Sequence, residues 1–287
     1  MKRLALAVLS LISGSQFLLA QVSVELVLPQ NKFLPAEEFQ AGVRIINRSG
    51  QPLSLGAETD WIEFAIETST GESIPQTSAP PVQRPFTLES SKQGTLKVDL
   101  APCFDLRKPG YYQIRAVVKI KNWSEALTTK SVPFEIIEGT KIWEQVFGVP
   151  SPSGNNPPEV RKYTLQQANY LKEPRLYLRV SAADGSVLKV INIGPMLSIG
   201  MPEPLLDKSN RLHLLQQVGA RSSLYLIFNS NGDKELRHTY EYSGSRPRLQ
   251  WSEKGGIEVK GGVRKTSPND VPPEPEIISN VETNQTH

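Results

Sequence analysis

Apolar and polar residues alternate most clearly in the stretch from 104 to 120, which reads FDLRKPGYYQIRAVVKI. Every second position from 112 onward is apolar, namely Tyr112, Ile114, Ala116, Val118 and Ile120. A period of two is typical of a strand that is buried on one face. The turn-forming residues that end in Gly110 come just before it and predict a corner. We therefore expect this strand to lie inside a β fold, with other strands packed on both sides.

Shorter stretches of the same alternation lie before and after this strand. They cover residues 22–28, 39–45, 62–66, 85–89, 96–100 and 127–137, with turn-forming residues between most of them. No stretch between them has a useful length of helical periodicity. The pattern predicts an all-β first domain of seven strands over residues 21–138.

Three of these features resemble immunoglobulin-like and fibronectin type III sandwiches, in the form found in secreted bacterial proteins. They are the number of short strands, the aromatic Trp61 at the third strand and Tyr112 near the start of the sixth. In that family the tyrosine bonds back to the preceding turn, so the resemblance implies that Gly110 and Tyr112 form a structural corner. The cysteine pair of antibody domains is missing here, since Ala41 or Val43 and Ile114 take the corresponding positions. The resemblance covers residues 22–137 and implies a fold, not an activity.

A different pattern, with an internal repeat, occupies residues 139–262. The two copies span 163–194 and 212–242, and each leads from a Leu-Gln-Gln through a Leu-Tyr-Leu to an Asp-Gly or Asn-Gly pair. These segments are 165–167, 176–178 and 184–185 in the first copy, and 215–217, 224–226 and 231–232 in the second. Each copy predicts two strands, a two-residue hairpin turn and a third strand. Such units resemble propeller blades, but two cannot close a ring. We expect a second antiparallel β domain, either a sandwich or a curled sheet, that ends in a hairpin over 248–259.

The two ends of the chain have their own compositions. Residues 1–20 carry Lys2 and Arg3, an apolar run and a plausible cleavage point after Ala20, which predicts a secretory signal peptide. No later segment approaches a membrane-spanning length, so we expect no transmembrane segment after signal removal and an exported, periplasmic or extracellular protein. Residues 263–287 are rich in proline and acidic groups, which predicts a disordered tail.

The charge is unevenly distributed along the chain. The net charge of +3 gives no strong attraction to nucleic acid. Residues 21–138 carry 12 basic and 14 acidic side chains, whereas residues 139–262 carry 16 and 11. The second region is therefore mildly basic, which indicates either an ordinary solvated surface or attraction to an anionic polymer or lipid surface.

Side chains that could perform chemistry are few. The chain has three histidines, His213, His238 and His287, and one cysteine, Cys103. We interpret Cys103 as a small buried hydrophobe, and the first two histidines as packed or solvent-facing residues. No nucleophile elbow, phosphate-binding glycine loop, dinucleotide fingerprint or metal-ligand spacing occurs, so no cofactor and no metal are predicted.

Carboxylates alone can support glycoside hydrolysis. The candidates are Glu58, Asp60 and Glu63 around Trp61, and Glu144 beside Trp143. Acidic residues at strand ends are also common as plain solubilising groups, so this pattern has two interpretations.

Exposed aromatic side chains would instead suit a binding surface. The ligand-binding candidates are Trp61, Trp123, Trp143 and Trp251, and Trp123 is the best placed because it lies in a predicted hairpin between Asn122 and Ser124. We expect a non-enzymatic exported protein that binds or assembles with a protein or glycan partner. The alternatives are a carbohydrate-active enzyme or its glycan-binding accessory module, and a protease inhibitor.

Overall fold

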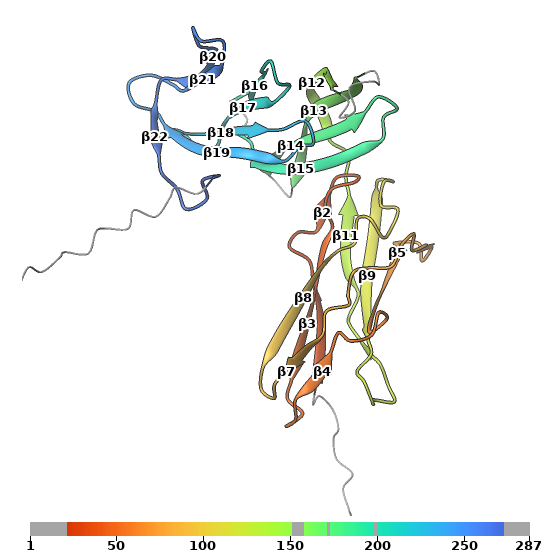
Figure 1. Cartoon of the computed structure of the whole chain (residues 1–287). Helices are drawn as coiled ribbons and strands as arrows, with labels where there is room; N and C mark the ends of the chain where they lie inside the picture. The colour runs from red at the N-terminus through yellow and green to blue at the C-terminus, as the bar shows by residue number, and fades with distance from the viewer. Residues whose placement is uncertain (1–21, 151–157, 171–172, 198–199, 273–287) are drawn as a thin grey trace, which may run out of the picture. The chain divides into compact units, whose positions relative to one another are not determined.

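The computed structural model describes residues 22–150, 158–170, 173–197 and 200–272 (Figure 1). All regular elements in these residues are strands, so the all-β prediction is confirmed. Contacts divide this part of the chain into two compact units. Unit 1 holds residues 22–29, 40–104 and 112–133, and unit 2 holds residues 30–39, 105–111 and 134–272. The predicted boundary between 138 and 139 therefore misses three short segments, 30–39, 105–111 and 134–138, that belong to the second unit.

Two main sheets and one short strand pair contain the strands before residue 139. The first sheet has the order β1 (Val22–Val27), β3 (Gln40–Asn47) and β8 (Gln93–Asp99). The short pair joins β4 (Leu53–Leu55) to β7 (Phe86–Leu88). The second sheet has the order β2 (Lys32–Phe33), β11 (Val132–Ile136), β9 (Gly110–Val118), β5 (Ile62–Thr68) and β6 (Ser73–Ile74), with β10 (Leu127–Thr128) beside β9.

The central position predicted for the 110–120 stretch is confirmed by β9. It begins at Gly110 and lies between β11 and β5. Its alternate side chains from Tyr112 to Val118 are all buried, and Ile114 lies opposite Ile66 of β5. Each fully buried aliphatic side chain of this kind contributes roughly 1.5–3 kcal/mol of transfer free energy. Cys103 is also buried, as expected for a small core residue.

Unit 2 contains two larger sheets and a separate hairpin (Figure 1). The first sheet has the order β12 (Thr140–Val149), β13 (Glu159–Tyr170), β14 (Glu173–Ala182) and β15 (Val187–Pro195). The second has the order β16 (Glu203–Leu206), β17 (Leu212–Gln217), β18 (Ser222–Phe228), β19 (Lys234–Glu241) and β22 (Val263–Lys265). The predicted last hairpin is confirmed and consists of β20 (Arg248–Trp251) and β21 (Ile257–Lys260).

The two sheets of unit 2 share one hydrophobic core. Leu165 and Leu178 of the first sheet belong to the same buried cluster as Leu214 and Leu226 of the second. Each sequence repeat therefore supplies the middle of one sheet, and both sheets turn one face to the common core. Of the two predicted arrangements, the structure has two separate sheets and not one curled sheet.

The Leu-Tyr-Leu motifs occupy equivalent positions, but the Leu-Gln-Gln motifs do not. Leu165 pairs with Leu178, whereas Leu226 pairs with Leu214 and not with Leu215. The predicted alignment of 165–167 with 215–217 is therefore wrong by one residue. A slip of one residue moves a side chain to the opposite face of a sheet, and Leu215 accordingly packs on the outer face, in the cluster of Tyr225.

Both glycine turns close hairpins, with a turn type that differs from the prediction. The amide of Gly185 donates to the carbonyl of Ala182 at 3.1 Å, and the amide of Gly232 donates to that of Asn229 at 2.9 Å. Only the glycine of each pair has a positive φ, 83° at Gly185 and 82° at Gly232. These are type I turns closed by a left-handed glycine, so the prediction of two-residue turns with positive φ at both positions is wrong.

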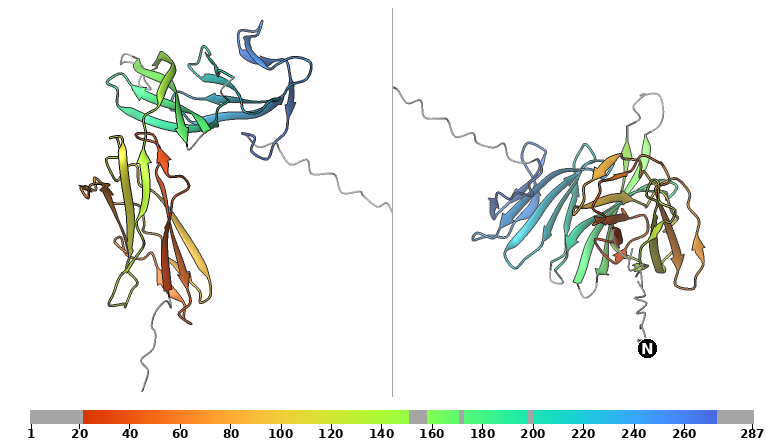
Figure 2. Two further views of the ribbon diagram at one scale, coloured as in Figure 1. Left: turned by 180° about the vertical axis from the view of Figure 1, so that it is seen from behind. Right: turned by 90° about the horizontal axis from the view of Figure 1, so that it is seen from below.

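The outer face of each unit 2 sheet is covered by a separate segment of unit 2. Leu34 packs against Tyr177 and Val190 on the first sheet. On the second sheet, hairpin β20–β21 packs Leu249 and Val259 into the outer cluster, and Figure 2 shows this hairpin in dark blue on one side of the sheet.

The predicted disordered tail is wrong for residues 263–272. Strand β22 pairs with β19, and Val271 exchanges two backbone hydrogen bonds with Arg237 at 2.8 and 3.1 Å. Backbone hydrogen bonds to the edge of a sheet hold this segment in place. Amino-acid composition, on which the prediction rested, carries no information about such pairing. Residues 273–287, and the predicted signal peptide at 1–20, lie outside the described residues. Within the described ranges, no helix is long and apolar enough to cross a membrane.

Candidate anion-binding pocket

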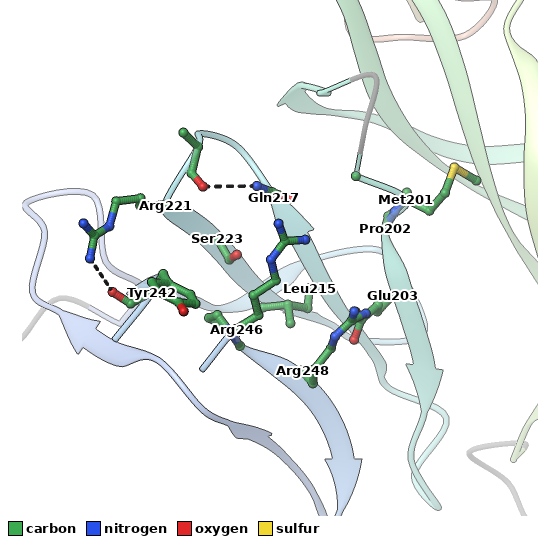
Figure 3. A pocket seen from close by; sticks show the side chains of 13 residues that line it. Met201, Pro202, Glu203, Leu215, Gln217, Arg221, Ser223, Tyr242, Arg246 and Arg248 are labelled. Carbon is green, nitrogen blue, oxygen red and sulfur yellow. Dashed lines mark hydrogen bonds and ion pairs between the residues drawn. The ribbon is translucent and has the colours of Figure 1, made fainter. Parts of the chain in front are cut away.

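A pocket of about 360 Å³ lies at one end of the outer face of the second unit 2 sheet (Figure 3). Leu215 and Gln217 of β17 and Ser223 of β18 line it, and Gln217 lies directly opposite Ser223 in the sheet. The remaining lining comes from residues 200–203, 220–221, 242 and 246–248. Hairpin β20–β21 packs on the same face, and Arg248 of β20 contributes to the pocket lining.

Two glycines allow the segment after β19 to fold over this end. Gly261 and Gly262 have φ values of 79° and 66°. A Cβ atom on Gly261 would lie 2.6 Å from the carbonyl oxygen of Arg246, and one on Gly262 would lie 2.7 Å from Cγ of Pro247. Only glycine permits both this backbone conformation and this close approach. The glycine pair thereby positions Arg246 and its neighbours at the pocket.

Three arginines and one glutamate line the pocket, which gives it an excess of positive charge. Arg221 donates to the carbonyl of Tyr242 at 3.3 Å, with its guanidinium carbon 5.6 Å from the centre of that ring. Arg248 forms an ion pair with Glu203. Figure 3 shows Arg246 between these two pairs. Arg246 is exposed and has no ion-pair partner among the described residues.

Hydrogen-bond acceptors lie beside these cations. The amide nitrogen of Gln217 donates to the carbonyls of Gly219 and Ala220 at 3.1 and 3.4 Å, which leaves its side-chain oxygen as an acceptor. Glu203 accepts from the amide of Leu249 at 3.2 Å in addition to its ion pair. The hydroxyl of Ser223 is a further donor and acceptor.

The four tryptophans predicted to bind ligand are not brought together. Trp61 is only 3% exposed and donates to the carbonyl of Val82 at 2.8 Å, so it is a core residue and its prediction as a binding residue is wrong. Trp143 is partly buried against the core of unit 2. Trp123 and Trp251 are 39% and 49% exposed, but they lie in different units. Trp251 belongs to β20 and does not line the pocket.

Three of the four candidate catalytic carboxylates around Trp61 and Trp143, namely Asp60, Glu63 and Glu144, form ion pairs with lysines. Lys119 contacts both Asp60, at 2.9 Å, and Glu63, and its hydrogen bond lowers the pKa of Asp60. Lys141 lies 2.9 Å from Glu144 and likewise lowers the pKa of that carboxyl group. A glycosidase acid needs a raised pKa, so these contacts give the hydrolase hypothesis no support.

A buried polar network surrounds His213 at the other end of the same outer face. Its Nδ1 lies 2.7 Å from the Tyr225 hydroxyl, and its Nε2 lies 3.4 Å from Asp207. Asp207 also accepts from Arg211 at 2.7 Å. Burial lowers the pKa of His213, which is only 3% exposed. The expectation that this histidine packs in the protein is confirmed.

Among the described residues, no group of three or more His, Cys, Asp or Glu could hold a metal ion.

Sequence reasoning missed the residues of the pocket. The signals that could have pointed to it were the Arg-Pro-Arg run at 246–248, the Gly-Gly pair at 261–262 and the basic charge of residues 139–262. None of these signals indicates that residues 200–203 and 220–221 line the same pocket.

Comparison with known proteins gives no family for this chain. No family model matches it, and no curated protein matches it. Among solved structures, the sporulation control protein Spo0M from Bacillus subtilis aligns with 9% sequence identity and a TM-score of 0.31. The alignment covers 60% of this chain and 89% of Spo0M. A likeness this low carries no argument about fold or function.

Proposed function

We propose that this chain is an exported, non-enzymatic binding protein that holds an anionic partner in the arginine pocket of unit 2. The observation that carries the proposal is Arg246, an exposed guanidinium that lies between Arg221 and Arg248 and has no ion-pair partner in the described chain. The export rests on the sequence of residues 1–20.

The chemistry of the pocket supports an anionic partner. A guanidinium offers paired N–H donors that match the oxygens of a carboxylate, sulfate or phosphate group. One glutamate among three arginines leaves the pocket positive. Its volume of about 360 Å³ also falls within the usual range of small-molecule sites, about 300–1,000 Å³.

The same surroundings favour binding over turnover. Glu203, the acidic residue of the lining, is already held by Arg248 and by the amide of Leu249. His213 belongs to a buried network and is not among the lining residues. The pocket therefore provides hydrogen-bond donors and positive charge for an anion. Among the described residues that line it, no nucleophile is paired with a general base.

The proposal is tested by measuring binding of the purified protein to fluorescent polygalacturonate, fluorescent polyglutamate and neutral dextran at low salt. We expect binding to at least one anionic polymer, no binding to dextran, and weakening by 0.5 M NaCl, which screens exposed charges. Arg246→Glu should weaken the binding at least about tenfold, because it replaces an attraction by a repulsion.

Arg84→Glu is the matched control, because Arg84 is an exposed arginine of unit 1. It should bind like the unmodified protein. Equal binding by the Arg246→Glu variant and the unmodified protein would refute the proposal, and so would equal affinity for dextran and the anionic polymers.

A further inference from the structure

The pocket presents hydrogen-bond acceptors as well as cations. Glu203, the side-chain oxygen of Gln217 and the hydroxyl of Ser223 all belong to the lining that contains Arg246. The amide nitrogen of Gln217 is already engaged with two carbonyls, so its oxygen is the atom left for a ligand. An occupant that satisfies this lining must both accept and donate hydrogen bonds.

A simple oxyanion does not meet that requirement. A carboxylate or sulfate group accepts hydrogen bonds but donates none, so beside Glu203 and Gln217 it would leave acceptor facing acceptor. Hydroxyl or N–H groups on the same molecule supply the missing donors. The occupant therefore combines one anionic group with several hydrogen-bond donors.

The aromatic side chain of the lining indicates what carries those groups. Tyr242 is 39% exposed, and Arg221 lies near its ring while binding its backbone carbonyl. The Tyr242 hydroxyl donates to the carbonyl of Gly244 at 3.2 Å, which helps to fix the ring. A fixed, half-exposed aromatic ring offers an apolar surface to the C–H face of a sugar ring. Met201, 67% exposed, adds apolar surface to the same lining.

We infer that the partner is a glycan, and that the pocket takes one of its acidic sugar residues. The sugar ring packs on Tyr242, its hydroxyls donate to Glu203 and Gln217, and its charged substituent binds Arg246. This inference rests on the proposed function and specifies the ligand class of the same pocket. An acidic peptide would satisfy Arg246, and its backbone N–H groups are donors, but it brings no sugar ring to pack on Tyr242.

The test is calorimetric titration of the purified protein with trigalacturonate, its methyl ester, triglutamate and inorganic phosphate. We expect trigalacturonate to bind at least about tenfold more tightly than each of the other three. A sulfated trisaccharide separates the two anionic substituents, since binding equal to that of trigalacturonate extends the ligand class to sulfated sugars.

Variants separate the contact with the sugar ring from the contact with the charge. Tyr242→Ala should weaken trigalacturonate binding about tenfold without changing the weak binding of triglutamate, because the peptide does not use the ring. Tyr242→Phe keeps the ring and should bind trigalacturonate like the unmodified protein. Trp251→Ala is the control, because Trp251 is an exposed aromatic residue of the adjacent hairpin outside the lining. If Tyr242→Ala does not fold, Tyr242→Leu takes its place.

The outcomes distinguish the inference from the proposed function. Triglutamate or phosphate bound as tightly as trigalacturonate, with loss in Arg246→Ala, would overturn the sugar assignment and leave an anion-binding protein. Binding of trigalacturonate that is unchanged in every Tyr242 variant would overturn the ring contact. Absence of binding to all of the anions would overturn both proposals.

Discussion

Equivalent residues of the two repeats differ in their hydrogen-bond partners. Tyr177 and Tyr225 are the central residues of the Leu-Tyr-Leu motifs, and both face away from the shared core. The Tyr225 hydroxyl lies 2.7 Å from His213, whereas the buried Tyr177 hydroxyl has no hydrogen-bond partner among the described residues. Burial raises the pKa of Tyr225 to about 12, so this hydroxyl keeps its proton at neutral pH. The repeat conserves the packing of the ring and not the role of its oxygen.

Phenylalanine substitutions should therefore affect the two tyrosines differently. Tyr225→Phe removes a buried hydrogen bond and leaves His213 without that partner, which should cost about 1–2 kcal/mol of the free energy of unfolding. Tyr177→Phe removes a hydroxyl without a partner and should be neutral or stabilising. Urea unfolding of the two variants gives both values, and an equal loss in the two variants would contradict this account.

The network around His213 predicts a pH dependence of stability. Burial holds the pKa of His213 below its ordinary value of about 6.5, so the unfolded chain binds a proton more readily than the folded chain. Stability should therefore be complete above pH 6.5 and should fall as the pH drops below it, by at most about 1.4 kcal/mol per pH unit for one proton. Asp207, whose pKa is lowered as well, adds a loss only at more acidic pH.

Urea midpoints between pH 7.5 and 5 measure this dependence, with His213→Gln as the control that removes the titrating group. The variant should show a shallower decline of the midpoint over this range. Identical declines in the variant and the unmodified protein would exclude His213 as the cause.

At the scale of elements, the alternation of apolar and polar residues and the turn-forming residues predicted the elements that depend on neighbouring residues. The central strand at 110–118, the last hairpin and the two glycine turns follow from such patterns. The alignment of the Leu-Gln-Gln motifs failed, because the connection between the two motifs is two residues shorter in the second copy and strand pairing, not motif spacing, sets the register. Strand β22 was missed because its partner, β19, lies more than twenty residues earlier in the chain.

Alanine substitutions at the two turn glycines should differ in cost. Gly185 and Gly232 both have positive φ, so alanine at either position should cost about 1 kcal/mol. A Cβ on Gly185 would have open space, whereas one on Gly232 would lie 2.9 Å from Val180 and 3.1 Å from Ile191. Gly232→Ala should therefore lose about 1–3 kcal/mol more, as for overpacked sites.

The matched pair of glycine variants makes this test specific. Both carry the same backbone penalty, so the difference between their urea midpoints reports the packing of the second turn against the first sheet. Equal midpoints would show that this turn does not pack as described.

At the scale of the whole molecule, the sequence predicted an all-β chain of two parts but not the place where it would bind. The pocket collects Glu203, Arg221, Tyr242 and Arg246 from segments spread over more than forty residues. They meet because sheet pairing aligns β16 to β19 and because the Gly-Gly pair admits the segment at 246–247. Composition gave only a basic second region, and the tryptophans proved to be scattered between core and surface.

The most direct test of the account is the location of the bound anion, measured by amide chemical-shift changes in an NMR titration of the labelled protein with trigalacturonate. We predict that the largest changes fall on the lining, at Gln217, Ser223, Tyr242 and Arg246, and that they disappear in Arg246→Glu. Changes centred on unit 1, for example around Trp123, or changes that persist in Arg246→Glu, would contradict it.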